Sequence, residues 1–371
     1  MKDVLVIGAG KIGQTIVDLL ARSGDYRVTI ADRAPPALAA LPRDAEVRTL
    51  TLDATDGAAL RSALQGRFAV LSAAPWQLTV RIAEAARDAG VHYLDLTEDV
   101  ASTRRIRELA EGAARAFIPQ CGLAPGFVSI AAAELMRRFE RLDSVRLRVG
   151  ALPAYPSNAL NYNLTWSTDG VINEYIEPCD AIVDGRRCTV PALEEREEFS
   201  LDGVLYEAFN TSGGLGTLCE TLAGRVRTLN YRTIRYPGHA AIMKALLHDL
   251  RLKDRREVLK DILENALPAT LQDVVIVFVT VSGWRGGRLM QDTYARKIYS
   301  APFGGEQRSA IQITTASSIC AMLDLLAQGR LPMAGFVRQE DVGLADFLAN
   351  RFGGVYAEPA AAAAPALARA A

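Results

Sequence analysis

The chain has 371 residues, half of them hydrophobic, and a formal net charge of −1. This length is typical of two domains with sizeable buried cores, and the charge balance excludes a strongly basic surface, so neither nucleic acid nor a membrane is expected as a partner. Five scattered cysteines without a C-x-x-C pair indicate free thiols in a reducing compartment and no metal site. The first predicted strand leaves no room for a signal peptide, and no apolar run reaches membrane length, so we expect a cytoplasmic protein.

The first predicted strand, residues 2–7, leads directly into a G-x-G-x-x-G pattern, and apolar spacing then predicts a helix. This context is typical of a dinucleotide-binding turn. Gly8 allows the tight turn, Gly10 lets the backbone approach a pyrophosphate, and Gly13 lets helix and strand pack closely, while the helix N-terminus offers free N–H groups. The alternative is a turn whose glycines serve packing alone. The cofactor-binding residues expected here are Gly8, Gly10, Lys11, Ile12 and Gly13.

The second predicted strand, residues 26–32, ends in an acid, Asp32, about 20 residues beyond the glycines. A carboxylate there accepts hydrogen bonds from the adenosine ribose and repels a 2′-phosphate, so we expect NAD, with NADP less favoured. Arg33 follows directly and would suit a 2′-phosphate, and Asp32 as a strand-end cap is the other alternative. Asp53, after the third strand, is expected near the adenine or as the N-cap of the next helix.

The alternation of strand and helix continues to residue 123, with strands at 68–72, 92–96 and 117–121 and helices at 79–90 and 102–117. It predicts an α/β fold, with a Rossmann-type, doubly wound parallel sheet over residues 1–123 and a ligand crevice at the carboxyl ends of the strands.

Small and acidic residues follow two of these strands. Ser72, Ala73 and Pro75 come after the fourth strand, where they are expected to line the nicotinamide ribose. Asp95 ends the fifth strand and faces the same crevice, where its carboxylate can orient the substrate amine or a water. The alternative at this position is helix capping by Asp99 or Thr97.

Residues 124–310 predict a second, α+β domain that binds substrate. Its expected elements are strands at 144–150, 161–166 and 228–231, helices at 240–250 and 254–265, and a hairpin of 274–282 and 289–300 across the turn 285–288. Residues 179–198 form a polar stretch. Helices at 314–328 and 340–351 are expected to return the chain to the first domain within the segment 311–353, and the Ala/Pro-rich residues 354–371 are expected to be disordered.

Polar side chains gather in three segments of the second domain. Asn163 lies in an alternating run that presents amides and hydroxyls on one face, and Thr211 and Ser212 precede two glycines in a turn that suits a carboxylate. Arg235, or else Arg232, can fork onto a substrate carboxylate. We expect the catalytic residues among His239, Asp95 and Tyr236, because histidine moves protons near neutral pH; a helix-start cap is the alternative for His239.

These segments together resemble the saccharopine dehydrogenase family, through the runs 6–10, 123–126, 207–214 and 233–239. The resemblance implies a Rossmann domain joined to an α/β domain that binds substrate and helps form a homodimer. It also implies NAD(P)-dependent oxidation at a carbon bonded to the lysine ε-nitrogen. Ala124 stands where glutamate-forming members carry Asp, and the second domain is shorter than theirs, whereas the run 161–167 looks like the corresponding strand of the saccharopine enzymes.

The resemblance implies oxidation of free lysine to allysine as the expected reaction, glutamate-forming oxidation of saccharopine as the alternative, and a non-catalytic NAD sensor as the minor one. An ammonium has no lone pair to stabilise the developing iminium, and lysine titrates near ~10.4, so a base is needed. His239 or Asp95 is expected to take that proton. Hydride transfer then gives an imine, which water hydrolyses or the α-amine traps.

Overall fold

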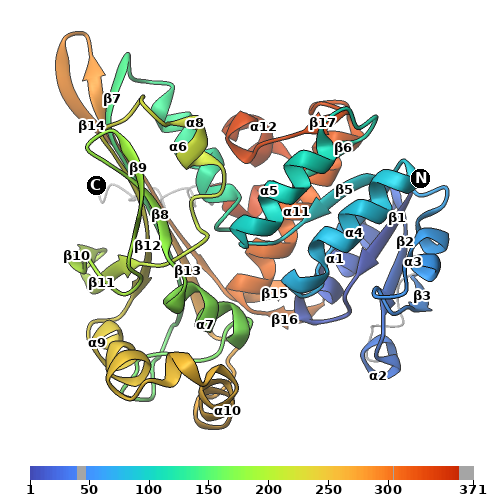
Figure 1. Ribbon diagram of the computed structural model, residues 1–371, viewed down its shortest axis with the longest axis horizontal. Helices are drawn as coiled ribbons and strands as arrows, with labels where there is room; N and C mark the ends of the chain where they lie inside the picture. The colour runs from blue at the N-terminus through green and yellow to red at the C-terminus, as the bar shows by residue number, and fades with distance from the viewer. Residues whose placement is uncertain (40–46, 304, 359–371) are drawn as a thin grey trace, which may run out of the picture.

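The computed structural model describes residues 1–39, 47–303 and 305–358. Two halves are seen side by side in Figure 1, one built on a parallel sheet and one on a larger mixed sheet. The first half contains the N-terminus. The second carries a long hairpin, β13 (Asp273–Arg285) and β14 (Arg288–Tyr299), that projects at the upper left and agrees with the predicted hairpin.

The sheet of the first half has seven parallel strands in the order β17-β6-β5-β4-β1-β2-β3. Their bounds are β1 (Lys2–Ile7), β2 (Tyr26–Asp32), β3 (Arg48–Thr51), β4 (Ala69–Ser72), β5 (His92–Asp95), β6 (Ala116–Ile118) and β17 (Gly335–Phe336). The order reverses between β4 and β1, which is the point where such sheets bind ligands. The predicted doubly wound α/β fold is therefore confirmed.

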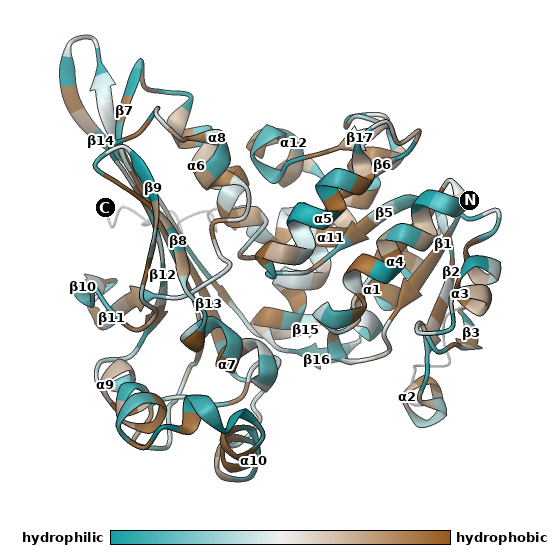
Figure 2. Ribbon diagram, viewed as in Figure 1, coloured by the Kyte–Doolittle hydropathy of each residue, from teal (hydrophilic) through white to brown (hydrophobic). Residues whose placement is uncertain are grey.

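Helices cover both faces of this sheet, because alternate residues of its strands point to opposite sides and both sets are apolar. Val4 and Val6 face the core beneath α1 (Lys11–Arg22), while Leu5 and Ile7 face the core beneath α3 (Gly57–Leu64), α4 (Trp76–Ala89) and α5 (Val100–Ala110). Helix α2 (Pro35–Ala39) follows β2. Figure 2 shows brown, hydrophobic strands at the centre of this half. Helix α5 ends earlier than predicted, because the left-handed Gly112 follows it.

The second sheet has the strand order β10-β11-β12-β7-β13-β14, and β8 and β9 extend it beside β12. The bounds are β7 (Arg141–Pro153), β8 (Cys179–Val183), β9 (Arg186–Val190), β10 (Glu197–Leu201), β11 (Val204–Asn210) and β12 (Thr228–Arg235). Only β7 and β12 pair in parallel among these strands as described. The polar stretch 179–198 thus contains strands that its composition did not reveal.

Helices pack at one end of this sheet (Figure 1): α7 (Thr168–Ile176), α9 (His239–Lys244), which continues as one π-helical turn over Ala245–Asp249, and α10 (Arg256–Ala266). The strand predicted at 161–166 is absent from the structure. Asn158 instead donates from its amide to the carbonyl of Tyr162 and to Oδ1 of Asn163. Such local hydrogen bonds compete with a strand ladder, so the segment is irregular.

Two buried helices join the halves, α6 (Phe127–Met136) and α11 (Ala310–Ala327). Both belong to one core that continues from the first sheet to the second. The sequence prediction missed α6, because its uniformly apolar surface gives no helical periodicity. Helix α11 is long and apolar enough to cross a membrane by length and composition, but 89% of it is buried inside the protein, as in the core helix of a globular fold.

Residues 311–353 lie against the first half, where α11 packs on α1 and β17 pairs with β6. The single helix predicted at 340–351 is wrong, since a short 3-10 turn (Gln339–Asp341) and α12 (Leu344–Ala349) are separated at Gly343. The disorder predicted from 354 is also wrong at its start. Tyr356 is fully buried, stacks on Phe127 and donates to the carbonyl of Thr314. The rest of the predicted tail, residues 359–371, lies outside the described residues.

Candidate functional site

The turn between β1 and α1 has the geometry of a dinucleotide-phosphate site. Gly8 adopts φ +106°, and a Cβ there would lie 2.6 Å from the carbonyl oxygen of Ala73. A Cβ on Gly13 would lie 1.8 Å from the carbonyl oxygen of Gly8, whereas one on Gly10 would meet nothing within 4 Å. Because no side chain caps α1, the N–H groups of its first turn, including Lys11 and Ile12, are free for an anion. These residues fit the pyrophosphate of a dinucleotide.

Asp32 closes this turn from the end of β2. Its Oδ2 accepts a hydrogen bond from Ala9 N at 2.7 Å, and its Oδ1 accepts one from Ala34 N at 2.8 Å. The carboxylate therefore acts as the strand-end cap that we considered, while it lies beside the glycines where a ribose would bind.

Asp53 is exposed and forms a local turn in which its Oδ1 accepts from both the N–H and the hydroxyl of Thr55 at 2.8 Å. The N-cap of α3 is Asp56, so the capping role considered for Asp53 is wrong. The hydrogen bonds from Thr55 lower the pKa of Asp53, and Arg33 and Arg81 lower it further. Two guanidinium groups thus lie near the expected adenosine end of the crevice.

The turn after β4 completes the crevice. Ala73 contacts the glycine turn, Pro75 is the N-cap residue of α4, and the buried Ser72 hydroxyl has no hydrogen-bond partner among the described residues. An unpartnered buried hydroxyl at the carboxyl end of a central strand suits a ligand that supplies the missing bond. Contact of these positions with the nicotinamide ribose stays a prediction.

Asp95 is fully engaged within the first half. It is almost completely buried and accepts hydrogen bonds from Tyr93 Oη at 2.8 Å, Thr97 N at 3.0 Å and Gln120 N at 2.8 Å. Burial raises the pKa of Asp95 to about 6. With these donors in place, Asp95 fastens the ends of β5 and β6 together, and this geometry does not fit the base that we predicted. Asp99 caps α5 through Ser102 N at 2.7 Å, as the alternative stated.

In the second half, three side chains form a buried relay. The Arg235 Nε donates to Tyr175 Oη at 2.9 Å, and Tyr175 Oη lies 3.0 Å from His239 Nε2. The His239 Nδ1 lies 2.8 Å from the carbonyl of Leu160, which can only accept. The proton of His239 is therefore assigned to Nδ1, and Nε2 accepts from Tyr175. Arg235 is 2% exposed and, of the described residues, no acid forms an ion pair with it.

This geometry corrects the role of His239. The pKa of His239 is lowered to about 3, mainly by burial and also by Arg235, so the imidazole is neutral at physiological pH. Both ring nitrogens are engaged, and the side chain caps no helix. His239 therefore positions Tyr175 and, through it, Arg235, and is neither the predicted base nor the alternative helix cap.

Tyr236 and Arg232 point to the opposite face of the second sheet. Tyr236 donates from its hydroxyl to the carbonyl of Pro153 at 3.0 Å and stacks on Tyr206. Arg232 forms ion pairs with Glu195 and Glu197. Successive residues along an extended chain face opposite sides of the sheet, so Tyr236 cannot lie on the same face as its neighbour Arg235, where Tyr175 and His239 also lie. The catalytic role predicted for Tyr236 and the anchoring role considered for Arg232 do not fit this arrangement.

The other predicted substrate contacts lie near the relay. Thr211 is buried and its hydroxyl lies 2.6 Å from that of Thr233, on the same face of β12 as Arg235. Ser212 follows it and donates from its N–H to the carbonyl of Glu174 at 3.0 Å. Asn163 is buried and accepts from Asn158.

Glu174 lies near Arg235 and was missed by the sequence analysis. We call Glu174 together with Arg235, Tyr175 and His239 the substrate cluster. Glu174 is 7% exposed on α7, and no hydrogen bond or ion pair reaches its carboxylate from the described part of the chain. Its pKa is raised to about 8, mainly by burial and also by the nearby Glu98, while Arg235 opposes the shift. The signal in the sequence was an acid placed at helical spacing among apolar residues, next to Val171 and Tyr175.

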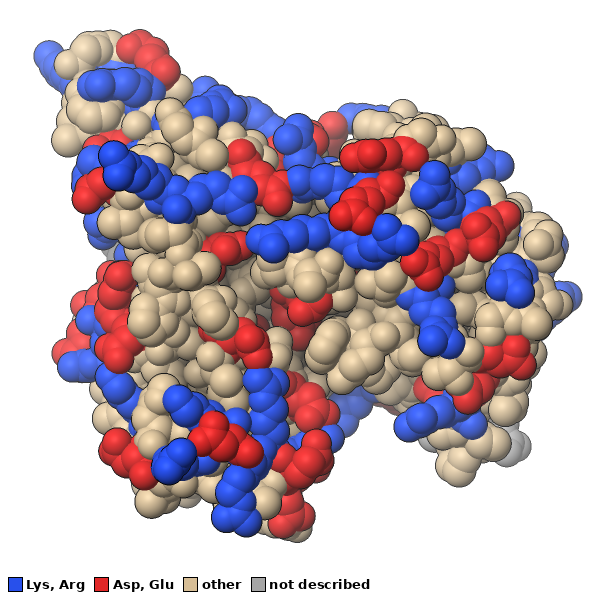
Figure 3. Space-filling model, in the orientation of Figure 1, with Lys and Arg blue, Asp and Glu red and all other residues tan. Residues whose placement is uncertain are grey.

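The first and second halves contact each other next to the substrate cluster. Gly213 lies so close to the loop after β5 that an added Cβ would be 2.8 Å from the carbonyl oxygen of Glu98, and Gly216 is similarly close to Gln120. Figure 3 shows a hollow between the halves, with acidic side chains inside it and a band of Lys and Arg along its upper rim. The carboxyl ends of the first sheet thus face the charged cluster of the second half.

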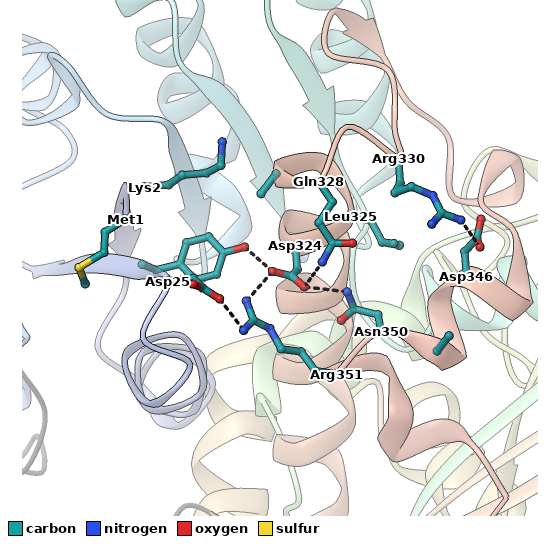
Figure 4. A pocket seen from close by; sticks show the side chains of 13 residues that line it. Met1, Lys2, Asp25, Asp324, Leu325, Gln328, Arg330, Asp346, Asn350 and Arg351 are labelled. Atoms are coloured by element: carbon teal, nitrogen blue, oxygen red, sulfur yellow. Dashed lines mark hydrogen bonds and ion pairs between the residues drawn. The ribbon is translucent and has the colours of Figure 1, made fainter.

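A cavity of about 710 Å³ lies elsewhere, at the amino ends of β1 and β2 (Figure 4). Its central acid, Asp324, accepts hydrogen bonds from Tyr26, Gln328, Asn350 and Arg351. Because these polar groups satisfy one another and ligands of such sheets bind at the other edge, we regard this cavity as structural.

Comparisons with known proteins agree with this architecture. Residues 4–118 match the model of the saccharopine dehydrogenase NADP-binding domain, and residues 122–352 match that of the saccharopine dehydrogenase C-terminal domain. The glutamate-forming, NADP-dependent saccharopine dehydrogenase of Saccharomyces cerevisiae is 27% identical over 268 residues, which cover 68% of this chain and 59% of that protein. The mitochondrial alpha-aminoadipic semialdehyde synthase of Rattus norvegicus is 23% identical over 192 residues, covering 50% of this chain and 21% of that protein.

The solved apo structure of the S. cerevisiae saccharopine dehydrogenase (L-Glu forming) has the same fold, with a TM-score of 0.77 and 20% identity, and the match covers 92% of this chain and 94% of that chain. The chain spans about 59% of the length of the curated yeast relative. The two family models together cover most of the chain and confirm the resemblance that the motifs indicated. The chain therefore belongs to the saccharopine dehydrogenase family.

Proposed function

We propose that the protein is a nicotinamide-dependent dehydrogenase that oxidises a C–N bond of an amino acid. One observation carries this proposal: a glycine turn that fits a dinucleotide faces a buried Arg235 and Glu174, neither of which has a counter-ion in the described structure. An unpaired buried guanidinium is costly, and so is a buried carboxyl group that ionises only as pH rises through about 8, so their retention favours a ligand with a carboxylate and an amine. The names of the relatives, which act on such compounds, support the same assignment.

For the cofactor, we propose NADP(H) in place of the NAD expected from Asp32. The matched domain and the yeast relative carry NADP in their names. Arg33 and Arg81 lie close enough to Asp53 to lower its pKa, and such guanidinium groups suit a 2′-phosphate. Asp32 remains the opposing feature, because its carboxylate repels that phosphate.

For the substrate, saccharopine in a glutamate-forming reaction has the better support, since the relatives are named for it. Oxidation of the secondary amine would give an imine, and water would split this into an aldehyde and glutamate. Saccharopine therefore replaces free lysine, whose oxidation to allysine (a lysine 6-dehydrogenase activity) we expected from the sequence, as the first candidate substrate.

Free lysine stays the second candidate because of the charges in the cluster. Among the described residues, Arg235 is a single guanidinium that forms no ion pair, and Glu98 and Glu174 are two acidic side chains that form none. Lysine carries the complementary set of one carboxylate and two amines, whereas saccharopine carries three carboxylates. The cluster itself therefore favours the smaller substrate.

Each residue then has a defined task. The bound nicotinamide supplies the hydride acceptor. Arg235 binds a substrate carboxylate, held in place by Tyr175 and His239. Asn163, Thr211 and Ser212 are our predicted polar contacts to the substrate.

The test is a spectrophotometric assay of NAD and NADP reduction with saccharopine and with lysine, giving kcat/KM for all four pairs. Turnover of either amine supports a dehydrogenase, and the larger value identifies substrate and cofactor. Cofactor binding without turnover of any amine would contradict the proposal and favour the non-catalytic nucleotide sensor.

We also propose a homodimer in the cytoplasm that has no nucleic-acid or membrane partner. The edge strand β14 supports self-association, because Leu289 and Tyr299 are exposed on it. Light scattering on the eluted protein would give the mass, and a monomer at micromolar concentration would contradict the dimer.

A further inference from the structure

Two glutamates approach each other across the junction of the halves. Glu98 belongs to the loop between β5 and α5, and Glu174 belongs to α7 of the second half. The loop after β11 contacts both of them in consecutive residues: Ser212 donates from its N–H to the Glu174 carbonyl at 3.0 Å, and Gly213 packs against Glu98. The pair therefore lies where the carboxyl end of β5 meets the substrate cluster.

Neither carboxylate is neutralised by the protein. No Lys, Arg or His of residues 1–39, 47–303 and 305–358 forms an ion pair with Glu98 or Glu174, although Arg235 and Glu174 are near enough to shift each other's pKa. Burial is the main cause of the raised pKa of each glutamate. A pair of carboxyl groups with raised pKa values binds a proton more tightly than free carboxylates do and can accept one from a neighbouring amine.

A second observation points to a ligand at the same place. The hydroxyls of Tyr162 and Thr165 are both more than nine-tenths buried and lie near each other, and in the described structure neither forms a well-aligned hydrogen bond. The Arg235 guanidinium lies 4.9 Å from the centre of the Tyr162 ring, and Glu174 affects the pKa of Tyr162. Buried hydroxyls without a well-aligned hydrogen bond, next to Arg235 and Glu174, indicate that polar atoms of a substrate complete this site.

We propose that Glu174, assisted by Glu98 from the other half, accepts the proton of the substrate amine before hydride transfer. This inference rests on the proposed function. One Glu174 oxygen takes the N–H proton and becomes a carboxylic acid, which leaves the nitrogen lone pair free. The C–H bond then breaks, its electron pair leaves with the hydride for the oxidised nicotinamide, and the lone pair forms the C=N bond.

The charged and titratable groups near Glu174 come from several elements. Glu98 from the β5–α5 loop and Arg235 from β12 shift its pKa. Glu174 in turn raises the pKa of groups around it, namely Tyr162 from the segment before α7, Tyr175 from α7, Cys179 from β8 and Tyr231 from β12. Glu98 raises the pKa of Glu174 and Arg235 lowers it. Only the ionised carboxylate can accept a proton, so kcat/KM is expected to increase as pH rises through about 8.

The test compares Glu174→Gln with Glu177→Gln, a matched control at the exposed end of the same helix. Glu174→Gln is expected to lower kcat by roughly 10²–10⁴-fold and to remove the rise near pH 8, with an unchanged circular-dichroism spectrum. The control is expected to keep the wild-type profile. Glu98→Gln removes the like charge, so the rise is expected to shift to lower pH.

Infrared difference spectra give a readout apart from activity. The wild type should lose a protonated carboxyl band as pH rises through about 8, above the range in which Asp95 and Asp273, with pKa values of about 6, lose theirs, and Glu174→Gln should lack that band. If the wild type turns over substrate and Glu174→Gln has the same kcat and pH profile, this inference is overturned but the proposed function is not. Absence of turnover by the wild type with either amine overturns the proposed function and, with it, this inference.

Discussion

The two halves of the site handle charge by different means. In the first half, the glycine turn offers backbone N–H groups at the start of α1, and no ionisable side chain is needed to bind an anion there. In the second half, the buried Arg235 carries a full charge, and the buried Glu174 becomes charged only as pH rises through about 8. The first arrangement depends on a few neighbouring residues and is insensitive to pH, whereas the second depends on distant segments and on protonation. The following substitutions test the two arrangements one at a time.

Arg235→Lys should have the largest effect. Lysine keeps the charge but loses the Nε donor to Tyr175 and the forked geometry, so the substrate KM is expected to rise about 100-fold, or roughly 2.7 kcal/mol. Steady-state kinetics with the preferred amine would measure this. Arg232→Lys is the matched control from the same strand, because its side chain is paired on the opposite face. An unchanged KM in Arg235→Lys would return Arg235 to a structural role.

Gly10→Ala tests the backbone half. Its φ of −71° suits alanine, and a Cβ there meets no protein atom within 4 Å, so the melting temperature should be unchanged. The methyl group would instead meet the pyrophosphate, and the cofactor KM should rise roughly tenfold or more, the scale of ~1–3 kcal/mol for overpacking. Gly13→Ala gives the contrast, since its Cβ clashes with the carbonyl of Gly8 and should destabilise the fold itself. Normal cofactor affinity in Gly10→Ala would place the dinucleotide elsewhere.

His239→Asn distinguishes a positioning residue from a base. Loss of the acceptor for Tyr175 costs about one hydrogen bond, ~1 kcal/mol, so the substrate KM should rise roughly fivefold while kcat changes little. The pH profile should keep its form, because the pKa of His239, at about 3, lies far below the range of the assay. A fall in kcat of two orders of magnitude with loss of a limb of the profile would restore His239 as the base.

These differences also explain what the sequence could predict. The glycine pattern, the parallel strands and the hairpin are local features, and each carries its own signal in residue spacing. The direction in which a side chain points is harder to predict, because a shift of one position reverses it. Arg235 and Tyr236 are neighbours in the sequence, yet they face opposite sides of the sheet. Glu174 had no motif at all, and its importance depends on burial against Arg235, which lies 61 positions along the chain. Contacts of this kind arise from tertiary packing.

Asp95→Asn should have the smallest effect on activity, and it sharpens the same contrast. In the wild type, one oxygen of Asp95 accepts from Thr97 N and Gln120 N, and the other accepts from Tyr93 Oη. The asparagine Oδ1 can keep both backbone bonds, and its amide can donate to Tyr93 Oη, whose proton can turn to the Thr79 carbonyl 3.3 Å away. We therefore expect kcat within about threefold of the wild type, against roughly 10²–10⁴-fold for loss of a base.

The stability of this variant should also depend less on pH. The pKa of Asp95 is raised from 3.8 to about 6 in the folded protein, so the neutral form is favoured there and the contribution of this group to stability is lost as pH rises from about 4 through 6. Asparagine is neutral throughout and removes that slope. Denaturant unfolding of both proteins at pH 4, 5, 6 and 7 would measure the difference, and parallel plots of stability against pH would show that folding does not raise the pKa of Asp95.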